Sequence, residues 1–260
     1  MKDQYNGPTL DEVTALARRA GEAALRHFRH NDTLEMHNKL NDSDIVTSAD
    51  KESEEIITGY VRARYPDHAI LSEESGETAG TSGFRWVIDP IDGTTNFFSG
   101  IPVWGVSIGV EHEGKTVIGV VYLPALDEMF CAVRGEGASL NGTPIHVSDE
   151  TALSRSVVAT GFPVDKDRNP DNNLDNFSRI MPLVRDVRRL GSAAADLCYT
   201  AAGFFGGYWE MNLHEWDVNA GMLILGEAGG TCTRFRPDRG VSIVCGNPAI
   251  HRRLSSLLEG

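Results

Sequence analysis

Two carboxylates at the end of a short apolar run are the residues of this chain whose type and spacing best suit chemistry. The segment WVIDPIDG, residues 86–93, places Asp89 and Asp92 after the run and Gly93 directly behind them. An apolar run bounded by Pro and Gly is typical of a buried strand, so both acids are expected at its mouth. Two unpaired acids there repel each other and resist desolvation, whereas Mg²⁺ binds carboxylate and carbonyl oxygens. The pattern predicts a metal and phosphate site, and Gly93 permits close approach of the backbone to a ligand.

Asp92 followed by Gly93 also fits a simple turn, because Asp-Gly pairs are common in hairpins and Asp often caps helices. That interpretation is weakened by the acids at the ends of other predicted elements, at Asp50, Glu73 and Asp217. Together with the pair at 89 and 92, these acids form four acidic sites. We expect the four sites to converge in the folded chain.

The chain is acidic, with 260 residues, 41% of them hydrophobic, and a formal net charge of −13. Sequence-independent binding of nucleic acid needs clustered Lys and Arg, and anionic membrane surfaces repel such a chain, so neither is an expected partner. The same charge repels phosphate esters unless bound cations reverse the local field. We therefore expect a small phosphate ester as the partner, bound together with metal ions.

The four cysteines, Cys131, Cys198, Cys232 and Cys245, form no CxxC pair and lie in apolar stretches, which predicts reduced thiols in the core. No histidine pairs with a cysteine at zinc-finger spacing, so zinc is not expected. Residues 1–13 contain no apolar signal region, and no run approaches the roughly 18 apolar residues of a membrane span. We expect a cytoplasmic protein.

The first half of the chain predicts two helices and a sheet that position these acids. Thr9 and Glu12 fit a capping box ahead of apolar residues at helical spacing. A second helix is predicted from about Ser48 to Tyr65, with Asp50 in its first turn. Three strands joined by turns follow and predict an antiparallel meander over Val103–Glu111, Thr116–Leu123 and Glu128–Val133.

From about Thr151, strand-like and helical segments alternate, which predicts an α/β second half. The polar stretch Asp165–Asp175 is expected to be a surface loop. We predict two tightly packed subdomains, residues 1–150 and 151–260. The second contains predicted strands at 157–160 and 241–245 and predicted helices at 192–202 and 218–227.

Two other glycine patterns are discounted as sites. Residues 105–109 match G-x-S-x-G, but a serine nucleophile needs a sharp strand-to-helix turn and these residues are strand-like. Residues 203–207 lack the Lys and the Ser or Thr of a phosphate loop, so they are predicted to end a helix.

Several segments carry a family resemblance. DPIDGTTNF, residues 89–97, resembles the first signature of the inositol monophosphatase family, and WDVNAG at 216–221 with GEAGG at 226–230 resembles the second. The similarity covers essentially the whole chain, through DIVTSAD at 44–50, SEESG at 72–76 and RRLGSAA at 188–194. It implies a mixed α/β fold, a layered αβαβα sandwich of the inositol monophosphatase and fructose-1,6-bisphosphatase type. The active site would lie between the two halves.

The resemblance also implies a site for two or three Mg²⁺ ions. The ligands would be Glu73, Asp89, the Ile91 carbonyl, Asp92 and Asp217, with Asp89 between two metals. Most ligands then fall in residues 1–150 and one in 151–260. The chemistry would be an in-line displacement by water without a covalent enzyme intermediate. The catalytic residues implied are Thr94, Asp50 and Glu73, with Thr94 and Asp50 orienting or deprotonating the attacking water.

For the substrate, the resemblance implies that the Gly93 and Thr94 amides hold the phosphate. The other implied contacts, at the metal site and on the alcohol side, are Asp92, Asp217, Gly191, Ser192, Ala193 and Glu210. Glu210 is interpreted as a hydroxyl acceptor, and the alternative is an ion-pair partner for Arg188 or Arg189.

Four other residues are given minor roles. Lys39 aligns with a family lysine near the outer metal, and its alternative is a solvated loop charge. Trp86, Trp216 and His214 are predicted to pack rather than to react.

The preferred function is hydrolysis of myo-inositol monophosphate or a similar polyol phosphate to the alcohol and inorganic phosphate. The alternatives are a phosphatase for histidinol phosphate or another small sugar phosphate, and a binding or regulatory protein that keeps the fold with little turnover. The segment TGFP at 160–163 is similar to bacterial members, which leaves exact inositol specificity open. The resemblance also implies a homodimer.

Overall fold

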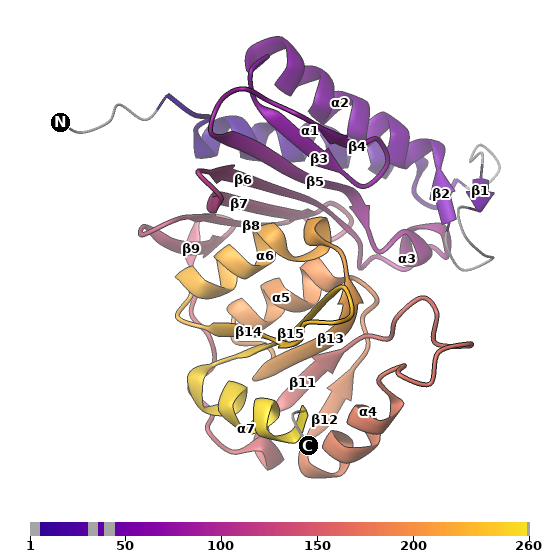
Figure 1. Ribbon diagram of the computed structural model, residues 1–260, viewed down its shortest axis with the longest axis vertical. Coiled ribbons are helices and arrows are strands. Elements are labelled where there is room, and N and C mark those ends of the chain that lie inside the picture. The colour runs from indigo at the N-terminus through magenta and orange to yellow at the C-terminus, as the bar shows by residue number, and fades with distance from the viewer. Residues whose placement is uncertain (1–5, 31–35, 39–44, 259–260) are drawn as a thin grey trace.

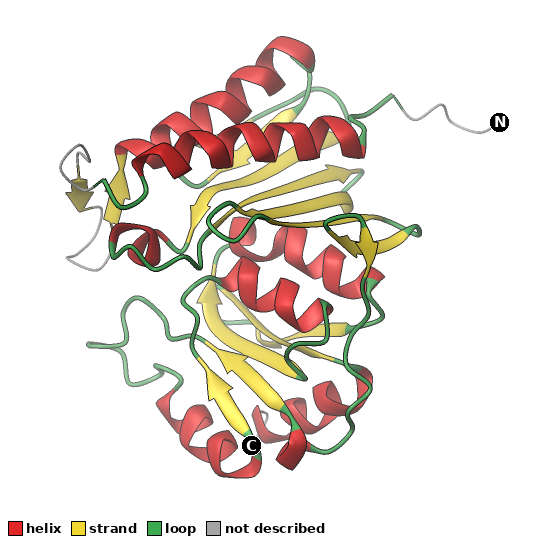
Figure 2. Cartoon of the chain, turned by 180° about the vertical axis from the view of Figure 1, so that it is seen from behind, coloured by secondary structure: helices red, strands yellow, loops and turns green. Residues whose placement is uncertain are grey.

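The elements of the chain stack in five alternating layers of helices and strands (Figure 1). The computed structural model describes residues 6–30, 36–38 and 45–258. Seen from behind in Figure 2, two sheets enclose one helical layer and each sheet carries helices on its outer face. The predicted αβαβα sandwich is therefore confirmed. In order, the layers are α1 (Leu10–His27) and α2 (Ser48–Arg64), an eight-stranded sheet, α5 (Ala193–Ala201) and α6 (Glu215–Glu227), a five-stranded sheet, and α4 (Leu174–Ile180) and α7 (Pro248–Leu258).

The outer helical layer forms as the sequence predicts. The Thr9 hydroxyl accepts the Glu12 N–H at 3.3 Å and the Glu12 carboxylate accepts the Thr9 N–H at 2.8 Å, so the capping box is confirmed. Helix α1 buries Val13 and α2 buries Ile57 in the core beneath them. Helix α2 ends one residue before the predicted Tyr65.

The eight-stranded sheet contains the predicted meander. Its order is β10-β9-β8-β7-β6-β5-β3-β4. Strands β5 to β10 pair antiparallel with their neighbours in sequence, whereas β3 lies parallel to β5. The strands are β3 (Ala69–Ser72), β4 (Gly76–Thr78), β5 (Phe84–Asp92), β6 (Gly105–His112), β7 (Lys115–Leu123), β8 (Glu128–Val133), β9 (Gly137–Leu140) and β10 (Thr143–Pro144).

Strand β5 carries a bulge between its two acids. Asp89 faces Ser107 of β6 and Asp92 faces Gly105, so a step of three residues on β5 matches a step of two on β6. Successive side chains of a regular strand point to opposite faces, so acids three residues apart would diverge. The extra residue of the bulge brings both carboxylates to the same side of the sheet.

A turn and a short helix follow β5 directly. Gly93 has a φ of +86°, in the left-handed region that favours glycine, and α3 (Thr94–Phe98) begins at the next residue. A two-stranded antiparallel ribbon of β1 (Met36–Asn38) and β2 (Ile45–Thr47) lies beside α3 (Figure 1). The two carboxylates of β5 are therefore followed at once by a change of chain direction.

The five-stranded sheet has the order β12-β11-β13-β15-β14. Strand β11 lies parallel to β12 and β13, while β15 lies antiparallel to β13 and β14. The predicted strands at 157–160 and 241–245 are confirmed within one residue. The strands are β11 (Val157–Thr160), β12 (Asp186–Arg188), β13 (Gly207–Leu213), β14 (Thr231–Arg236) and β15 (Val241–Gly246).

An apolar core joins the two sheets through α5 and α6. It includes Val121 of β7, Leu197 of α5, Ile224 of α6 and Ile243 of β15, all fully buried. The helices therefore pack on both sheets at once, and their N-termini are held in fixed positions relative to β5. The subdomain boundary near residue 150 stays a prediction.

The cysteines differ from the sequence prediction. Cys232 of β14 and Cys245 of β15 face each other in antiparallel register, with their Cα atoms 4.1 Å apart, and form a disulfide. The prediction of reduced thiols is wrong for this pair, because sheet register brings together two cysteines that no local motif connects. Cys131 and Cys198 are free and buried, as predicted.

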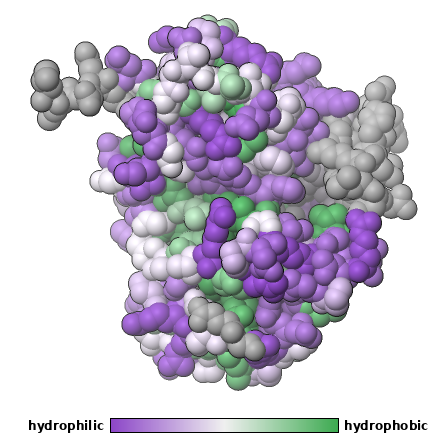
Figure 3. Space-filling view, in the orientation of Figure 1, coloured by the Kyte–Doolittle hydropathy of each residue, from purple (hydrophilic) through white to green (hydrophobic). Residues whose placement is uncertain are grey.

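Several smaller predictions are confirmed. Ser107 stands in the middle of β6, so the G-x-S-x-G match forms no nucleophile turn. Helix α5 ends at Ala201 and Gly203 has a φ of +77°, which confirms the helix stop. The loop predicted over 165–175 is present as far as Asn173, and α4 begins at Leu174, before the predicted end of the loop. Among the described helices, none combines the length and the apolarity that a membrane crossing requires. Hydrophilic residues dominate the face seen in Figure 3.

Candidate active site

Three aspartates from distant parts of the chain meet where the two halves join. Asp89 and Asp92 come from the end of β5, and Asp217 comes from the first turn of α6. A carboxylate oxygen of each lies within 4.8 Å of the others. The structure therefore brings together three of the acids whose convergence the sequence predicts.

Asp92 is held by the N-terminus of α5. The Ser192 hydroxyl and the Ala194 N–H both donate to its Oδ2 oxygen, the second at 2.8 Å. Amide groups at a helix N-terminus lack partners within the helix and carry partial positive charge, so they stabilise a carboxylate. This carboxylate from the first half is thus positioned by a helix of the second half.

Asp217 is held by its own helix. Its Oδ2 oxygen accepts the backbone N–H of His214 at 2.6 Å, at the start of α6. The His214 ring stacks on Trp216 with ring centroids 4.6 Å apart, which supports the packing role predicted for both residues. Trp86 is fully buried and donates to His68 Nδ1 at 3.0 Å, so it is also a packing residue, as predicted.

Burial and mutual repulsion make the three carboxyls hard to ionise. The pKa of Asp89 lies well above its ordinary value, first because the group is buried and then because Glu73, Asp92 and Asp217 are close. Burial raises the pKa of Asp92 to about 6, despite the two hydrogen bonds that favour its charged form. The pKa of Asp217 also lies well above the usual range, because of burial and then Asp92. A nearby cation would reverse all three effects.

The donor set fits a hard divalent cation. The cluster offers carboxylate oxygens alone, which are the ligands that Mg²⁺ prefers, and it contains neither the Cys nor the His typical of zinc sites. The mutual repulsion of the acids is the energetic cost that a bound cation removes. The cluster contains three of the predicted ligands, Asp89, Asp92 and Asp217, and the ligand roles of Glu73 and the Ile91 carbonyl stay predictions.

The other predicted metal and catalytic residues come from β3, α2 and the start of α3. Glu73 directly follows β3 and lies close enough to raise the pKa of Asp89. The Ile91 carbonyl accepts the Thr94 hydroxyl at 3.0 Å. Asp50 is buried in the first turn of α2. The pairing of Thr94 with Asp50 stays a prediction.

Two glycines let the turn after β5 approach the N-terminus of α5. Gly93 and Gly191 have φ values of +86° and +88°, both in the left-handed region. A Cβ atom on Gly93 would lie 3.1 Å from the Gly191 carbonyl oxygen and 3.3 Å from the Ser192 Cβ. The structure thus places the predicted phosphate-binding segment, Gly93 and Thr94, next to the predicted substrate contacts at 191–193.

A cavity of about 580 Å³ opens beside these acids. Glu73 and Asp217 line it together with Glu210, so two predicted metal ligands and the predicted hydroxyl acceptor share one space. Small-molecule sites typically measure roughly 300–1,000 Å³. The cavity therefore has room for a substrate the size of a sugar or polyol phosphate.

Glu210 is held by a tyrosine. Its Oε2 oxygen accepts the Tyr208 hydroxyl at 2.6 Å, and burial raises the Glu210 pKa to about 7, offset in part by that hydrogen bond and by Arg189. A Cβ atom on Gly161 would lie 1.9 Å from the nearer carboxylate oxygen, so the carboxylate fills space that only glycine leaves open. No ion pair joins Glu210 to Arg188 or Arg189 among the described residues, although the Arg189 charge acts on the Glu210 pKa, so the choice between hydroxyl acceptor and arginine partner stays a prediction.

Comparison with known protein families accounts for nearly the whole chain. A model of the inositol monophosphatase family matches residues 8–259. The chain belongs to the inositol monophosphatase family. The aspartate cluster, the turn after β5 and the adjoining cavity are thus features of an inositol monophosphatase-family protein.

Relatives within the inositol monophosphatase family carry two kinds of name. A protein of Pasteurella multocida named Nus factor SuhB is 43% identical, over 88% of this chain and 85% of its own length. A Rhizobium meliloti protein named inositol-1-monophosphatase is 40% identical, over 93% of this chain and 92% of its own. The solved structure of an inositol monophosphatase from Anabaena has a TM-score of 0.85 at 38% identity, and the match covers 96% of this chain and 94% of that one.

Sequence reasoning missed part of the cavity wall in this inositol monophosphatase-family chain. Phe162 and Arg168 line the cavity from the loop after β11. Arg239, in the turn between β14 and β15, forms an ion pair with Asp165 of that loop. The polar composition of the loop indicated only surface exposure, and no local signal connected it to Arg239. Lys39, predicted near the outer metal, lies outside the described residues.

Proposed function

We propose that this chain is a Mg²⁺-dependent phosphomonoesterase that hydrolyses myo-inositol monophosphate or a similar polyol phosphate to the alcohol and inorganic phosphate. The observation that carries the proposal is the meeting of Asp89, Asp92 and Asp217 within 4.8 Å, beside a cavity that Glu210 also lines. A relative named inositol-1-monophosphatase, 40% identical over most of both chains, supports the same chemistry.

The proposed metal ligands lie on one side of the cavity, where bound metal ions would act as the electrophile. Two or three Mg²⁺ ions would be held by Glu73, Asp89, the Ile91 carbonyl, Asp92 and Asp217. When bound, Mg²⁺ supplies positive charge to the phosphoryl group and to the leaving oxygen and makes hydroxide accessible near neutral pH. The protein keeps two of these ligands in place through the N-termini of α5 and α6, which donate to Asp92 and Asp217.

The residues around the metal ligands hold the water and the phosphate. Thr94, fixed by its hydrogen bond to the Ile91 carbonyl, is proposed to orient the attacking water with Asp50, and Glu73 is proposed to assist from the end of the neighbouring strand β3. The backbone amides of Gly93 and Thr94 are proposed to hold the phosphate oxygens, because Gly93 leaves no side chain between them and the ligand. Water then displaces the alcohol in line.

Glu210 favours a hydroxyl-bearing alcohol. Tyr208 occupies its Oε2 oxygen, so the Oε1 oxygen is the acceptor offered to the substrate. Ser192 and Ala193, at the start of α5, bring backbone groups to the same side of the cluster. A site built to hydrogen-bond a hydroxyl rejects an analogue without it, because the buried acceptor is then left unpaired. We therefore infer a polyol phosphate rather than a simple alkyl phosphate.

Phosphate release from a panel of esters tests the proposal. The panel holds inositol 1-phosphate, histidinol phosphate, fructose 1,6-bisphosphate and phosphoadenosine phosphate, each with Mg²⁺ and with chelator. The highest kcat/KM is expected for inositol 1-phosphate, and only with Mg²⁺. Preference for histidinol phosphate would support a phosphatase with a different substrate. Absence of phosphate release from every ester of the panel would refute the proposal.

A role as a Nus factor is the second candidate. The observation that favours it is the name of the Pasteurella multocida relative, which is 43% identical to this chain. The role would be independent of turnover, so a variant without phosphatase activity tests it. If Asp92→Asn restores function to a bacterium that lacks its own SuhB, the binding role is supported, and if only the active chain restores it, the role fails.

The proposal includes a cytoplasmic homodimer, as the family resemblance implies. Size-exclusion chromatography with light scattering measures the mass directly. A mass of about twice the 28.3 kDa of the chain supports the dimer, and a monomer at micromolar concentration contradicts it.

A further inference from the structure

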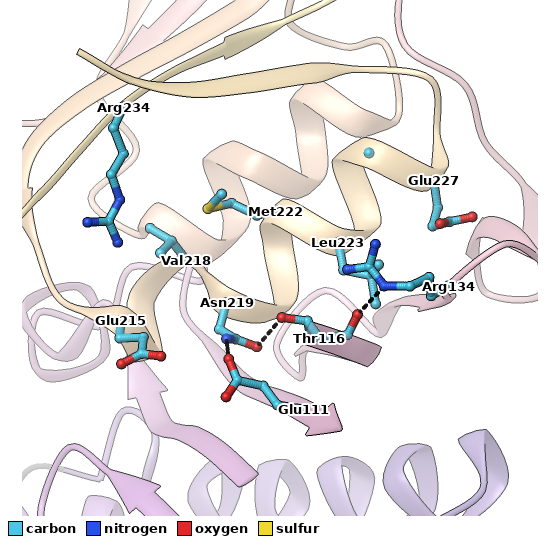
Figure 4. Close-up of a pocket in the computed structure, with 11 residues that line it drawn as sticks. Glu111, Thr116, Arg134, Glu215, Val218, Asn219, Met222, Leu223, Glu227 and Arg234 are labelled. Carbon is cyan, nitrogen blue, oxygen red and sulfur yellow. Dashed lines mark hydrogen bonds between the residues drawn. The ribbon is translucent and has the colours of Figure 1, made fainter. Parts of the chain in front are cut away.

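A second cavity, of about 480 Å³, opens on a different face of α6 (Figure 4). Val218, Met222 and Leu223 of α6 form its apolar floor. Arg134, just after β8, and Arg234, on β14, stand at its ends. The cavity shares no lining residue with the cavity beside the aspartate cluster. It is a separate space of a size typical of small-molecule sites.

The acids of this second cavity already have partners within the protein. Glu215 accepts two hydrogen bonds from Arg85, at 2.7 and 3.1 Å. Glu111 accepts the Asn219 amide at 2.8 Å, and Glu227 accepts two backbone N–H groups of the β8–β9 turn at 2.9 and 3.0 Å. All three carboxylates therefore have donors within the protein, and the Arg85 guanidinium contacts both Glu215 and Glu111.

The two arginines keep donors available. Arg134 uses its Nε to bond to the Thr116 carbonyl at 2.7 Å, and its terminal nitrogens bond to no other described residue. Arg234 is exposed on an edge strand and forms neither an ion pair nor a side-chain hydrogen bond with the described part of the chain. Figure 4 shows the two guanidinium groups on either side of the apolar floor. Guanidinium groups with free donors bind carboxylate, sulfonate or phosphate oxygens in pairs.

Gly226 adds room to the floor between the arginines. A Cβ atom at this position would meet nothing within 4 Å, so no close neighbour requires glycine there. Alanine is also the better helix former, so glycine weakens α6 at this point. The bare backbone extends the open space beside Met222 and Leu223.

We propose that this cavity binds a small organic anion with acidic groups at both ends of an apolar body. Arg134 and Arg234 each bind one acidic group, and the body lies on Val218 and Met222. The floor begins at the residue after Asp217, so an occupant packs against the helix that carries a predicted metal ligand. Binding itself does not depend on phosphatase activity, because the two cavities share no residue.

Calorimetric titration with naphthalene-1,5-disulfonate tests the proposal on the whole chain. This probe has two anionic groups on a flat apolar body and does not chelate Mg²⁺. Saturable one-to-one binding is expected for the natural sequence, with affinity about tenfold weaker for each of Arg134→Gln and Arg234→Gln, since each removes charge-assisted hydrogen bonds. Naphthalene-1-sulfonate, with one anionic group, is expected to bind about tenfold more weakly than the disulfonate.

Two further variants separate this cavity from general charge attraction. Gly226→Leu fills the floor without changing charge, has open space for its Cβ, and is expected to abolish binding while the melting temperature is maintained. The double variant Arg252→Gln/Arg253→Gln removes two positive charges from α7, on the far side of the five-stranded sheet, one more than either single variant at the cavity, and is expected to leave the affinity unchanged. Absence of saturable binding, or equal affinity in Gly226→Leu and the natural sequence, would overturn the proposal.

Discussion

Replacing Asp92 by Asn is expected to stabilise the metal-free protein and to destroy its response to Mg²⁺. Asp92 is buried and lies within 4.8 Å of two other carboxylates, so its charge is unfavourable unless a cation is bound. Asparagine has nearly the same shape and no charge. Its carbonyl oxygen can still accept the bonds from Ser192 and Ala194.

The magnitude follows from the raised pKa. Burial raises the pKa of Asp92 from 3.8 to about 6, so ionising it in the metal-free fold costs about 3 kcal/mol at pH 8. Because the pKa of Asp92 is higher in the folded than in the unfolded protein, the carboxyl does not lower the stability of the fold at pH below 3.8. The metal-free natural sequence loses stability as the pH rises from there through about 6. Less-than-ideal hydrogen bonds to asparagine cost about 1 kcal/mol, which leaves a gain of about 2 kcal/mol, or roughly 4–6 °C in Tm. At pH 5 the cost of ionising Asp92 is about 1.6 kcal/mol, so the gain from asparagine falls to about 0.6 kcal/mol.

Thermal unfolding at pH 8 and pH 5, each with EDTA and with Mg²⁺, measures these effects. Saturating Mg²⁺ at 100 times its Kd stabilises the natural sequence by about 2.7 kcal/mol, so the order of stability of the two proteins reverses when metal is added. Phosphatase activity of Asp92→Asn is expected to fall by more than the roughly 10–100-fold that loss of an outer-shell metal partner costs. A variant that is less stable in EDTA, or that keeps the full Mg²⁺ response, would refute the reasoning.

Four further variants follow from the same geometry. Thr94→Ala is expected to lower kcat by roughly 10²–10⁴-fold with little change in KM, because the group that orients water is lost; an equal loss of substrate binding in a titration contradicts that role. Glu210→Gln is expected to lower kcat/KM for inositol 1-phosphate by roughly tenfold relative to p-nitrophenyl phosphate, and a uniform loss on both esters contradicts it. Gly161→Ala pushes the Glu210 carboxylate aside, since the new Cβ would lie 1.9 Å from it, so KM for the polyol ester rises while the Tm changes little; an unchanged KM sinks this assignment. Asp196 has both oxygens buried without a hydrogen-bond partner in the described chain, and burial raises its pKa well above the usual range, so Asp196→Asn is expected to raise stability more at pH 8 than at pH 5 by up to about 1.4 kcal/mol per pH unit and to keep the Mg²⁺ response. If Asp196→Asn also lost the Mg²⁺ response, that loss would not be specific to Asp92, and this prediction would be wrong.

The order of several helices and strands along the chain was predictable, because each of these elements depends on a local sequence pattern. The capping box at Thr9, the apolar periods of α1 and α2, and the turns between β6, β7 and β8 all depend on residues close in sequence. The aspartates at 89, 92 and 217 were identifiable because their signatures are also local. Their convergence within 4.8 Å was expected from the number of acids at element ends, and the fold provides it.

Features that depend on register were not predictable from local patterns. The bulge that turns Asp89 and Asp92 to one side appears only in the pairing of β5 with β6. The Cys232–Cys245 disulfide depends on the register of β14 and β15, and the support of Asp92 by α5 depends on how the two sheets pack. No local sequence pattern identifies Gly161 as important. Its role depends on the Glu210 carboxylate, which is distant in sequence and lies beside it in the fold.

Phosphate release from inositol 1-phosphate before chelation, after chelation and after return of Mg²⁺ tests the central claim most directly. The account predicts activity that disappears with EDTA and returns with Mg²⁺ in the natural sequence, and that stays absent in Asp92→Asn at every Mg²⁺ concentration. Activity that persists in EDTA, or a variant as active as the natural sequence, would contradict the claim that the aspartate cluster is a metal-dependent phosphatase site.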